Sequence, residues 1–184
     1  FSTLVGYVEQ MFSMRAKHTG IEFIVDQKNS EEYLLLGDEH RIKQILINLV
    51  GNAIKFTEKG AVTLTTAIDD ERLLMTVADT GIGIPTETIG KLFSPFQQAD
   101  NSTSGRFGGS GLGLYISENL AVQMGGNIEV SSEEGIGSTF IVDLPYQRID
   151  KKERRVENKK GVHPFTEEKL KGNVLIAEDT PELQ

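Results

Sequence analysis

The sequence predicts a domain of mixed α/β (α+β) class, because helical and strand patterns follow one another along a single stretch of chain. Residues 1–17 repeat apolar side chains at helical spacing, and a second amphipathic helix runs from Asp38, a good N-cap, to about Thr57. Two strand patterns, at 61–68 and 73–78, are joined by a short polar turn. These patterns indicate one globular domain with flanking pieces.

The other predicted elements are shorter. A third helix ends at Gly125–Gly126, a typical C-terminal stop, and the remaining strand patterns cover 21–25, 33–36, 127–132 and 138–144. Residues 79–111 are rich in Gly, Ser, Thr and Pro, and a loop of that length in a compact domain is usually functional or disordered. Residues 147–160 are highly charged without apolar periodicity, which indicates a linker or a frayed helix extension.

Composition narrows the classes of function. Of 184 residues, 38% are hydrophobic and 25% are charged, which is typical of a soluble globular protein. The net charge of −8 argues against nucleic-acid partners and anionic membrane surfaces. Cysteine is absent, which excludes disulfides, zinc–thiolate sites and cysteine nucleophiles. No apolar run approaches the roughly 20 residues of a membrane span, and no signal peptide opens the chain, so we expect a cytoplasmic setting.

Three polar side chains share one face of the helix that begins after Asp38. Asn48, Asn52 and Lys55 are spaced i, i+4 and i+7, which places them on one side. Amide oxygens are hard ligands suited to Mg²⁺, and an ammonium group suits phosphate. The alternative is that both amides bond neighbouring backbone while Lys55 is solvated. This helix alone leaves both interpretations open.

A glycine motif follows directly after the strand at 73–78. It reads Asp79-Thr80-Gly81-Ile82-Gly83-Ile84-Pro85, and its two glycines allow the backbone to approach a planar ligand closely. An ionised Asp79 could accept a hydrogen bond from an exocyclic amine such as the adenine N6. A plain Asp-Thr-Gly turn is the alternative interpretation of this motif.

A second glycine run, residues 108–114, leads straight into the third helix. Such an approach leaves N–H groups and the positive end of the helix dipole facing outward, which suits phosphates. A Rossmann site is excluded because a long polar loop precedes the run, and the P-loop pattern is absent. A third pair, Gly135 and Gly137, precedes Ser138 and Thr139 in a hairpin, where a ligand role and an ordinary β-turn are both open.

Together these segments resemble the catalytic ATP-binding domain of two-component sensor histidine kinases. The Asn helix, the motif at Asp79, Leu92-Phe93-Ser94-Pro95-Phe96, the run at 108–114 and Gly135-Ile136-Gly137-Ser138-Thr139-Phe140 match its N, G1, F, G2 and G3 boxes in order, across roughly residues 3–146. The resemblance implies a Bergerat-type two-layer sandwich, in which helices cover one face of a mixed, mostly antiparallel sheet and a mobile lid closes over ATP.

The resemblance also implies a role for each matching residue. Asn52 would ligate Mg²⁺, Asn48 would lie near the metal-bound triphosphate, and Lys55 would contact a phosphate. Asp79 would bind the adenine amine. Arg106 in the lid would fold over the phosphates, with an exposed arginine of no ligand role as the alternative. The other residues expected to bind the nucleotide are Phe56, Gly81, Gly83, Ile84, Gly109, Gly111, Leu112, Gly113 and Thr139. Phe56 as a core residue is a nearly equal alternative, and Phe93 and Phe96 are expected to anchor the lid.

Asn48 favours a kinase over a hydrolase. Gyrase, heat-shock chaperones and mismatch-repair ATPases of the same fold carry a Glu at this place, and a carboxylate can deprotonate water whereas an amide cannot. We therefore expect a protein-histidine kinase that transfers the γ-phosphate of ATP, with Mg²⁺, to a supplied nucleophile. The alternatives are a degenerate interaction module, an anti-sigma-type serine kinase and an ATPase of the same superfamily.

The expected partners lie outside the catalytic segment. The family's acceptor is a His followed by an acidic residue on a dimeric helical hairpin, and His18, His40 and His163 all lack that setting. We expect residues 1–18 to end the connection from that hairpin, 19–146 to form the catalytic domain and 147–171 to form a linker. Residues 172–184, with Val174-Leu175-Ile176-Ala177-Glu178-Asp179, resemble the start of a receiver domain, so a receiver or response regulator is a second partner. No membrane contact is expected from this segment, whether or not the full-length protein is anchored in the inner membrane.

Overall fold

A mixed five-stranded sheet forms the centre of the computed structural model, which describes residues 1–28, 34–69, 71–96 and 111–149. The sheet has the order β1-β3-β4-β6-β5. Its strands are β1 (Ile21–Gln27), β3 (Gly60–Asp69), β4 (Arg72–Asp79), β5 (Asn127–Glu133) and β6 (Gly137–Pro145). β1 pairs with β3 in parallel, and every other neighbouring pair is antiparallel.

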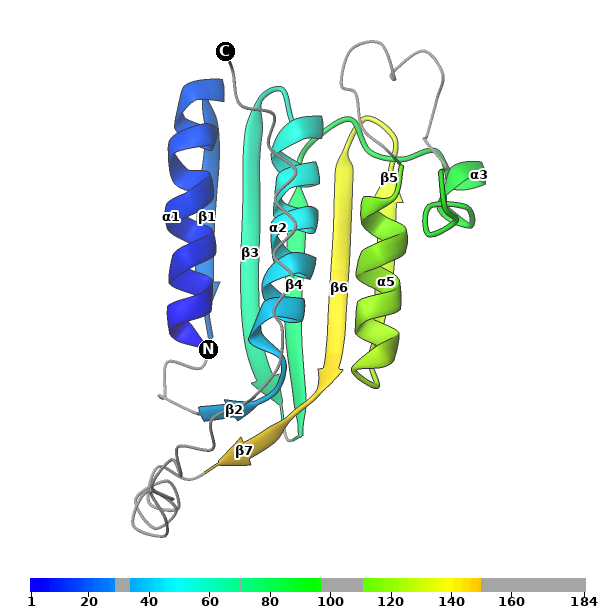
Figure 1. Ribbon diagram of the computed structural model, residues 1–184. Helices are drawn as coiled ribbons and strands as arrows, with labels where there is room; N and C mark the ends of the chain where they lie inside the picture. The colour runs from blue at the N-terminus through cyan, green and yellow to red at the C-terminus, as the bar shows by residue number, and fades with distance from the viewer. Residues whose placement is uncertain (29–33, 70, 97–110, 150–184) are drawn as a thin grey trace, which may run out of the picture. The chain divides into compact units, whose positions relative to one another are not determined.

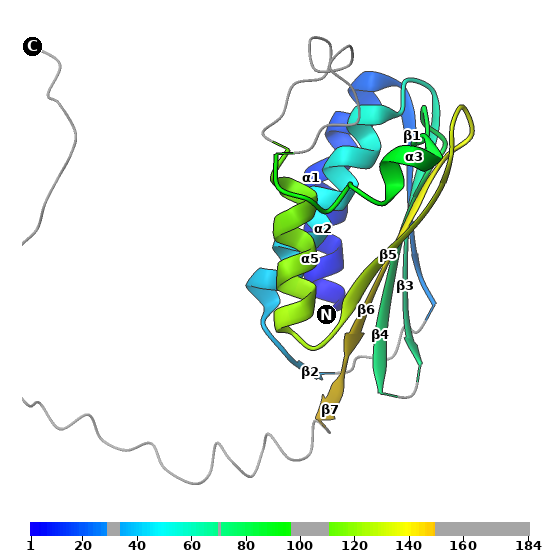
Figure 2. The same ribbon diagram turned by 90° about the vertical axis from the view of Figure 1, so that its right-hand side faces the viewer.

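Three helices form the second layer. They are α1 (Ser2–Thr19), α2 (Glu39–Phe56) and α5 (Gly113–Gln123), which lie side by side over one face of the sheet (Figure 1). The view turned by 90° shows all three on the same side of the strands (Figure 2). The predicted two-layer sandwich with a mixed, mostly antiparallel sheet is therefore confirmed.

The core lies between α2 and the inner face of the sheet. The side chains of β4 are buried and partly exposed in alternation, because successive residues of a strand point to opposite faces. Burying a large aliphatic side chain of this kind stabilises the fold by about 1.5–3 kcal/mol relative to leaving it exposed. The fully buried side chains include Ile45, Leu46, Leu49 and Val50 of α2 and Val62, Leu64, Met75, Val77, Val142 and Leu144 of the sheet.

Helix α1, which covers the predicted connection at residues 1–18, packs into the same core as the rest of the domain. The apolar face of α1 is buried in the same core as α2 and the sheet, through Leu4, Val5, Val8, Phe12 and Ala16. Gly20 ends the helix in the left-handed region, at φ 73°, and β1 follows at once. The helix is therefore an integral part of the layer, because its apolar stripe needs the sheet for burial. Its continuation from an upstream hairpin stays a prediction.

The structure describes only the first three residues of the predicted linker, 147–171. Residues Gln147–Ile149 form strand β7, which pairs in antiparallel fashion with β2 (Leu34–Leu36) in a small second sheet. Three residues are too few to show periodicity, so this strand exists only through its long-range pairing. The rest of the linker, the receiver-like segment and the predicted mobile lid at 97–107 lie outside the described residues. A one-turn helix, α3 (Thr86–Ile89), was likewise too short to predict.

The ends of α2 are fixed by polar side chains. The Asp38 carboxylate accepts hydrogen bonds from the backbone N–H groups of His40 (3.1 Å) and Arg41 (3.2 Å), which confirms the predicted N-cap. At the other end the buried Thr57 hydroxyl donates to the carbonyl of Ala53 (2.7 Å). These caps determine where the helix that carries Asn48 begins and ends.

Replacing the cap tests its contribution to stability. Asp38→Ala removes the acceptor for two backbone N–H groups, so we expect the free energy of unfolding to fall by about 1 kcal/mol in urea titration. Asp38→Asn is the matched control, because it keeps an acceptor but removes the exposed ion pair with Arg41 (3.1 Å), which contributes little. An Asn variant as unstable as the Ala variant would show that the ion pair matters and the cap does not.

Candidate active site

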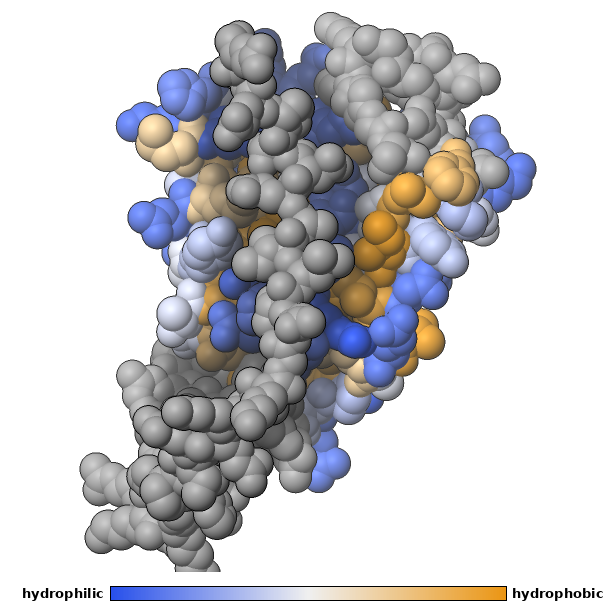
Figure 3. Space-filling view, in the orientation of Figure 1, coloured by the Kyte–Doolittle hydropathy of each residue, from blue (hydrophilic) through white to orange (hydrophobic). Residues whose placement is uncertain are grey.

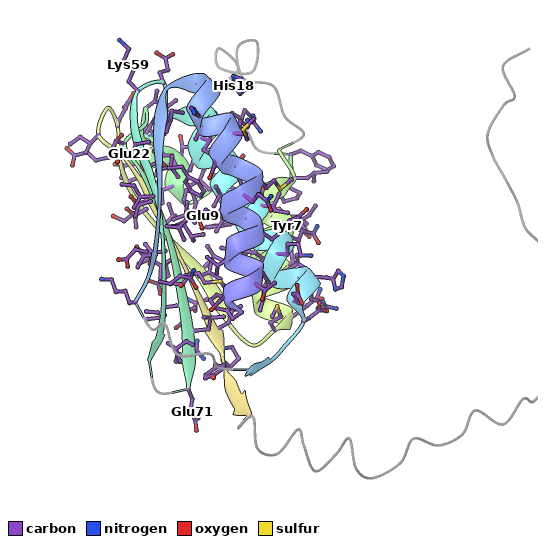
Figure 4. All side chains as sticks on the ribbon, turned by 90° about the vertical axis from the view of Figure 1, so that its left-hand side faces the viewer. Tyr7, Glu9, His18, Glu22, Lys59 and Glu71 are labelled. Carbon is purple, nitrogen blue, oxygen red and sulfur yellow. The ribbon has the colours of Figure 1, made fainter. Side chains whose placement is uncertain are left out.

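Four segments meet at one end of the domain: the C-termini of α2 and β4, the turn between β5 and β6, and the N-terminus of α5 (Figure 1). His18 and Lys59 lie at this end, whereas Glu71 lies at the opposite end (Figure 4). Antiparallel order brings these segments together, because β4 ends where β6 begins. Most of the predicted site residues that the structure describes belong to these segments.

The two asparagines of α2 face α5 and contact each other. The Asn48 Nδ2 group donates to the hydroxyl of Ser117 on α5 (2.9 Å), and the Asn52 Nδ2 group approaches the Oδ1 atom of Asn48 at 3.5 Å. Asn48 and Asn52 therefore share one face, as predicted. Their bonds to side chains contradict the alternative in which they merely bond neighbouring backbone.

The start of α5 lies unusually close to Asn48. A Cβ atom at Gly113 would overlap the Oδ1 atom of Asn48, so only glycine allows this approach. Gly111 adopts φ 68°, in the region that favours glycine, and Leu112 occupies the N-cap position. A leucine side chain cannot accept from the first N–H groups of a helix, which leaves the positive end of the dipole available for an anion.

α5 points its small polar residue inward. Ser117 is 1% exposed, whereas Ile116 is 38% and Val122 is 61% exposed. The space-filling view shows hydrophobic surface over this helix (Figure 3). Ser117 could not be recognised from the sequence, because a serine within an apolar helix gives no signal of the asparagine opposite.

Asp79 ends β4 as a partly buried carboxylate. Its Oδ1 atom accepts a hydrogen bond from the backbone N–H of Gly81 (2.8 Å). Burial raises the pKa of Asp79, and backbone hydrogen bonds from Gly81 and Ser138 act in the opposite direction. A carboxylate with little water around it is a strong acceptor for a ligand N–H group.

Two glycine turns hold Asp79 in place through backbone contacts. A Cβ atom at Gly81 would overlap the carbonyl oxygen of Phe56. A Cβ atom at Gly83 (φ 68°) would overlap the carbonyl oxygen of Glu133, and a Cβ atom at Gly137 (φ 141°) would overlap the carbonyl oxygen of Asp79. These glycines therefore serve the packing of one turn on another, and direct contact of Gly81 and Gly83 with a base stays a prediction.

Hydrogen bonds join the same two turns. The N–H of Gly135 donates to the carbonyl of Ile82 (2.7 Å), and the N–H of Ile84 donates to the Ser132 hydroxyl (2.8 Å). Ile84 thus takes part in the site through its backbone.

Thr139 is placed on the wrong side of the sheet for the predicted role. Ser138 pairs with Asp79 across β6 and β4, and it is 7% exposed on the inner face. Thr139 pairs with Ala78 and therefore points to the outer face, because side chains alternate along a strand. Ser138, whose hydroxyl lies 3.0 Å from that of Ser132, is the residue beside Asp79. Counting back two residues from the core residue Phe140 would have identified it.

Two cationic side chains, Lys55 of α2 and Arg15 of α1, lie near the C-terminal end of α2. The Lys55 ammonium is 4.6 Å from the centre of the Phe56 ring. Burial lowers the pKa of Lys55, and the positive charge of Arg15 on α1 lowers it further. Arg15 was not predicted, because it belongs to a different helix. The predicted residues Arg106 and Gly109 lie outside the described residues.

The donor set fits a Mg²⁺-bound nucleoside triphosphate. Within the described parts of the chain, no three His, Asp or Glu side chains form a metal-binding group. Mg²⁺ at phosphoryl-transfer sites is usually held by one or two protein ligands together with substrate phosphates, and the Oδ1 atom of Asn52 suits that chemistry. Asp79 would suit an amine on the base, and Lys55 and the start of α5 would suit phosphates.

Comparison with protein families agrees with this geometry. Residues 37–148 match the model of the histidine kinase-, DNA gyrase B-, and HSP90-like ATPases. The chain belongs to this family. The autoinducer 2 sensor kinase/phosphatase LuxQ of Vibrio parahaemolyticus is 33% identical over 187 residues, covering 97% of this chain and 22% of LuxQ. The sensor protein GacS of Pseudomonas syringae pv. syringae is 48% identical over 126 residues, 65% of this chain and 14% of GacS. The chain thus spans between 14% and 22% of the length of these relatives.

Solved structures of histidine kinases share the fold. Full-length ShkA in complex with AMPPNP matches with a TM-score of 0.71 and 37% identity, over 80% of this chain and 30% of ShkA. The nucleotide-free catalytic domain of histidine kinase ThkA matches with a TM-score of 0.68 and 33% identity, over 78% of this chain and 92% of that domain. The family and its fold support ATP binding.

Within the described residues, no helix has both the length and the apolarity to cross a bilayer.

Asp79→Asn separates a ligand role from a structural one. Because folding raises the pKa of Asp79, the folded chain holds the proton of this carboxyl more tightly than the unfolded chain does. Protonated Asp79 therefore stabilises the fold fully at pH values below the ordinary Asp pKa, and this stabilisation is lost as the pH rises through the raised pKa of the folded state. At neutral pH the Asn variant should therefore unfold at the same or a higher urea concentration. Its ATP affinity should fall about tenfold or more, because a charged acceptor is lost.

Calorimetric titration of the original chain provides the matching pH test. ATP affinity should decrease as pH falls through the raised pKa of Asp79, since protonation removes the acceptor. An affinity that is flat across the acid range would contradict the proposed contact with the adenine amine.

Gly113→Ala tests the close approach of α5. The added methyl group would displace the Asn48 amide, so we expect Mg²⁺-ATP affinity to fall by roughly tenfold, as for the loss of an outer-shell metal contact. Gly90→Ala is the control, because no atom lies within 4 Å of a Cβ atom there. Equal affinities of the two variants, measured by nucleotide titration, would show that the spacing between α2 and α5 is unimportant.

Proposed function

We propose that this chain is the ATP-binding catalytic part of a protein-histidine kinase. In this proposal it transfers the γ-phosphate of Mg²⁺-ATP to a histidine on a separate helical domain. Its membership of the family and its likeness to sensor histidine kinases support the nucleotide half of the reaction. The observation that carries the choice of a kinase is the Asn48–Asn52 pair in its contact with Ser117.

In this proposal the base, the phosphates and the metal ion are each bound by different residues. Asp79 would accept from the base amine, with its carboxylate oriented by the N–H of Gly81. Lys55 and the start of α5 would hold phosphate oxygens, and Asn52 would hold the metal. When bound, Mg²⁺ offsets the charge that develops on the phosphate oxygens during transfer.

Asn48 is unsuited to activating water. Its amide nitrogen donates to Ser117, and its oxygen lies 3.5 Å from the Asn52 nitrogen. An amide has no basic site at neutral pH, so it cannot act as the general base of a hydrolase. The site would therefore hold ATP intact until a nucleophile is supplied by another domain. Rapid hydrolysis by the chain alone, abolished by changing Asn48, would contradict this interpretation.

The deciding experiment supplies the missing nucleophile. The chain is mixed with radiolabelled ATP, Mg²⁺ and a separately produced helical hairpin that bears the acceptor histidine. We expect acid-labile, base-stable phosphate on the hairpin, and none with a hairpin whose histidine is replaced by Gln. Asn52→Ala should reduce transfer strongly. ATP binding without transfer to a verified cognate hairpin would favour a degenerate nucleotide-binding module.

The onward partner belongs to the same proposal. A receiver domain or response regulator would take the phosphate from the histidine. The segment that resembles the start of a receiver, residues 172–184, lies outside the described residues, so its support comes from the sequence alone. Adding a cognate receiver to the labelled hairpin should move the phosphate to an aspartate.

A further inference from the structure

Ser117 carries a buried hydroxyl that forms a hydrogen bond with a side chain of α2. It lies one helical turn after Gly113 on α5, so both residues face α2. Its hydroxyl accepts the hydrogen bond from the Nδ2 group of Asn48 at 2.9 Å, and the residue is 1% exposed. The next residue on this face, one turn further along, is the buried Ala121, so Ser117 is a polar position on an apolar face.

This bond determines which end of the Asn48 amide faces Asn52. A side-chain amide has a donor end and an acceptor end, and Ser117 engages the donor end. The acceptor end, Oδ1, is then directed toward the Nδ2 group of Asn52, 3.5 Å away. A hydrogen bond of that length is weak, so its effect is on orientation rather than on the stability of the fold.

The orientation of Asn52 decides whether it can ligate a metal. With its nitrogen toward Asn48, its oxygen is the atom left for a cation. The reverse orientation would present an NH₂ group, which has no lone pair to offer Mg²⁺. Groups that do not touch a metal commonly set the orientation of the ligands that do, and their loss typically costs 10–100-fold in metal affinity.

We propose that Ser117 is a positioning residue, which acts through Asn48 to direct the oxygen of Asn52 toward Mg²⁺. This inference rests on the proposed role of Asn52 as the metal ligand. It gives α5 a part in metal binding without a direct contact. Because Ser117 and Gly113 lie on the same face of α5, a shift of this helix would change the orientation of both amides.

The test is Ser117→Ala, which removes one buried oxygen and adds no bulk. Nucleotide affinity is measured by calorimetry at a series of Mg²⁺ concentrations and in EDTA. We expect the Mg²⁺ concentration that gives half of the maximal increase in nucleotide affinity to rise about tenfold. The nucleotide affinity measured in EDTA should stay unchanged. Thr66→Val is the matched control, because it removes a buried hydroxyl from β3, away from Asn48.

A second readout needs neither nucleotide nor metal. The side-chain amide NMR signals of Asn48 and Asn52, assigned with Asn48→Ala and Asn52→Ala, should both shift in ligand-free Ser117→Ala. They should stay in place in Thr66→Val. The Asn52 signal carries the proposal, because the hydrogen bonds of the described residues join Ser117 to Asn48 and Asn48 to Asn52.

The outcomes separate this inference from the proposed function. Affinity that falls equally with Mg²⁺ and in EDTA would mean that Ser117 is only structural and would overturn the proposal, as would an unshifted Asn52 signal. If the original chain binds nucleotide without any Mg²⁺ enhancement, the metal role of Asn52 fails, and the positioning proposal fails with it. Phosphate transfer to the hairpin tests the kinase activity separately.

Discussion

Helix α2 packs its apolar face against the inner face of the sheet, and the geometry of the site depends on this contact. Ile45, Leu46, Leu49 and Val50 are almost completely buried, so the helix cannot rotate without exposing them. Asn48 lies between these residues in the sequence and is therefore held at a fixed angle to the core. That angle directs it toward α5, where Ser117 provides a partner. The apolar packing of α2 thus positions polar groups that contribute little to stability themselves.

The carboxylate side of the site depends on a different constraint. Asp79 is held by turns whose backbones approach each other too closely for any side chain at Gly81, Gly83 or Gly137. Burial of the Asp79 carboxylate raises its pKa. Polar N–H groups from Gly81 and Ser138 compensate for part of that cost. The glycines therefore act on Asp79 indirectly, by allowing the close backbone packing around it.

An acidic protein would have to bind a polyphosphate through local groups. The chain has a net charge of −8, yet Lys55 on α2 and Arg15 on α1 are close enough for the charge of one to lower the pKa of the other. Two neighbouring cationic side chains offer a local positive field to an anion.

The sequence by itself determined the longer helices and strands, the order of the glycine motifs and the shared face of Asn48 and Asn52, because each depends on residues within a few turns of one another. It could not determine that α1 shares the core, that β7 pairs with β2, or that Ser138 rather than Thr139 lies beside Asp79. Those features depend on pairings between residues far apart in the chain. The contact of Ser117 with Asn48, across 69 positions, belongs to the same class. Local periodicity contains no information about which helix packs against which, and only the burial of all the apolar faces in one core settles it.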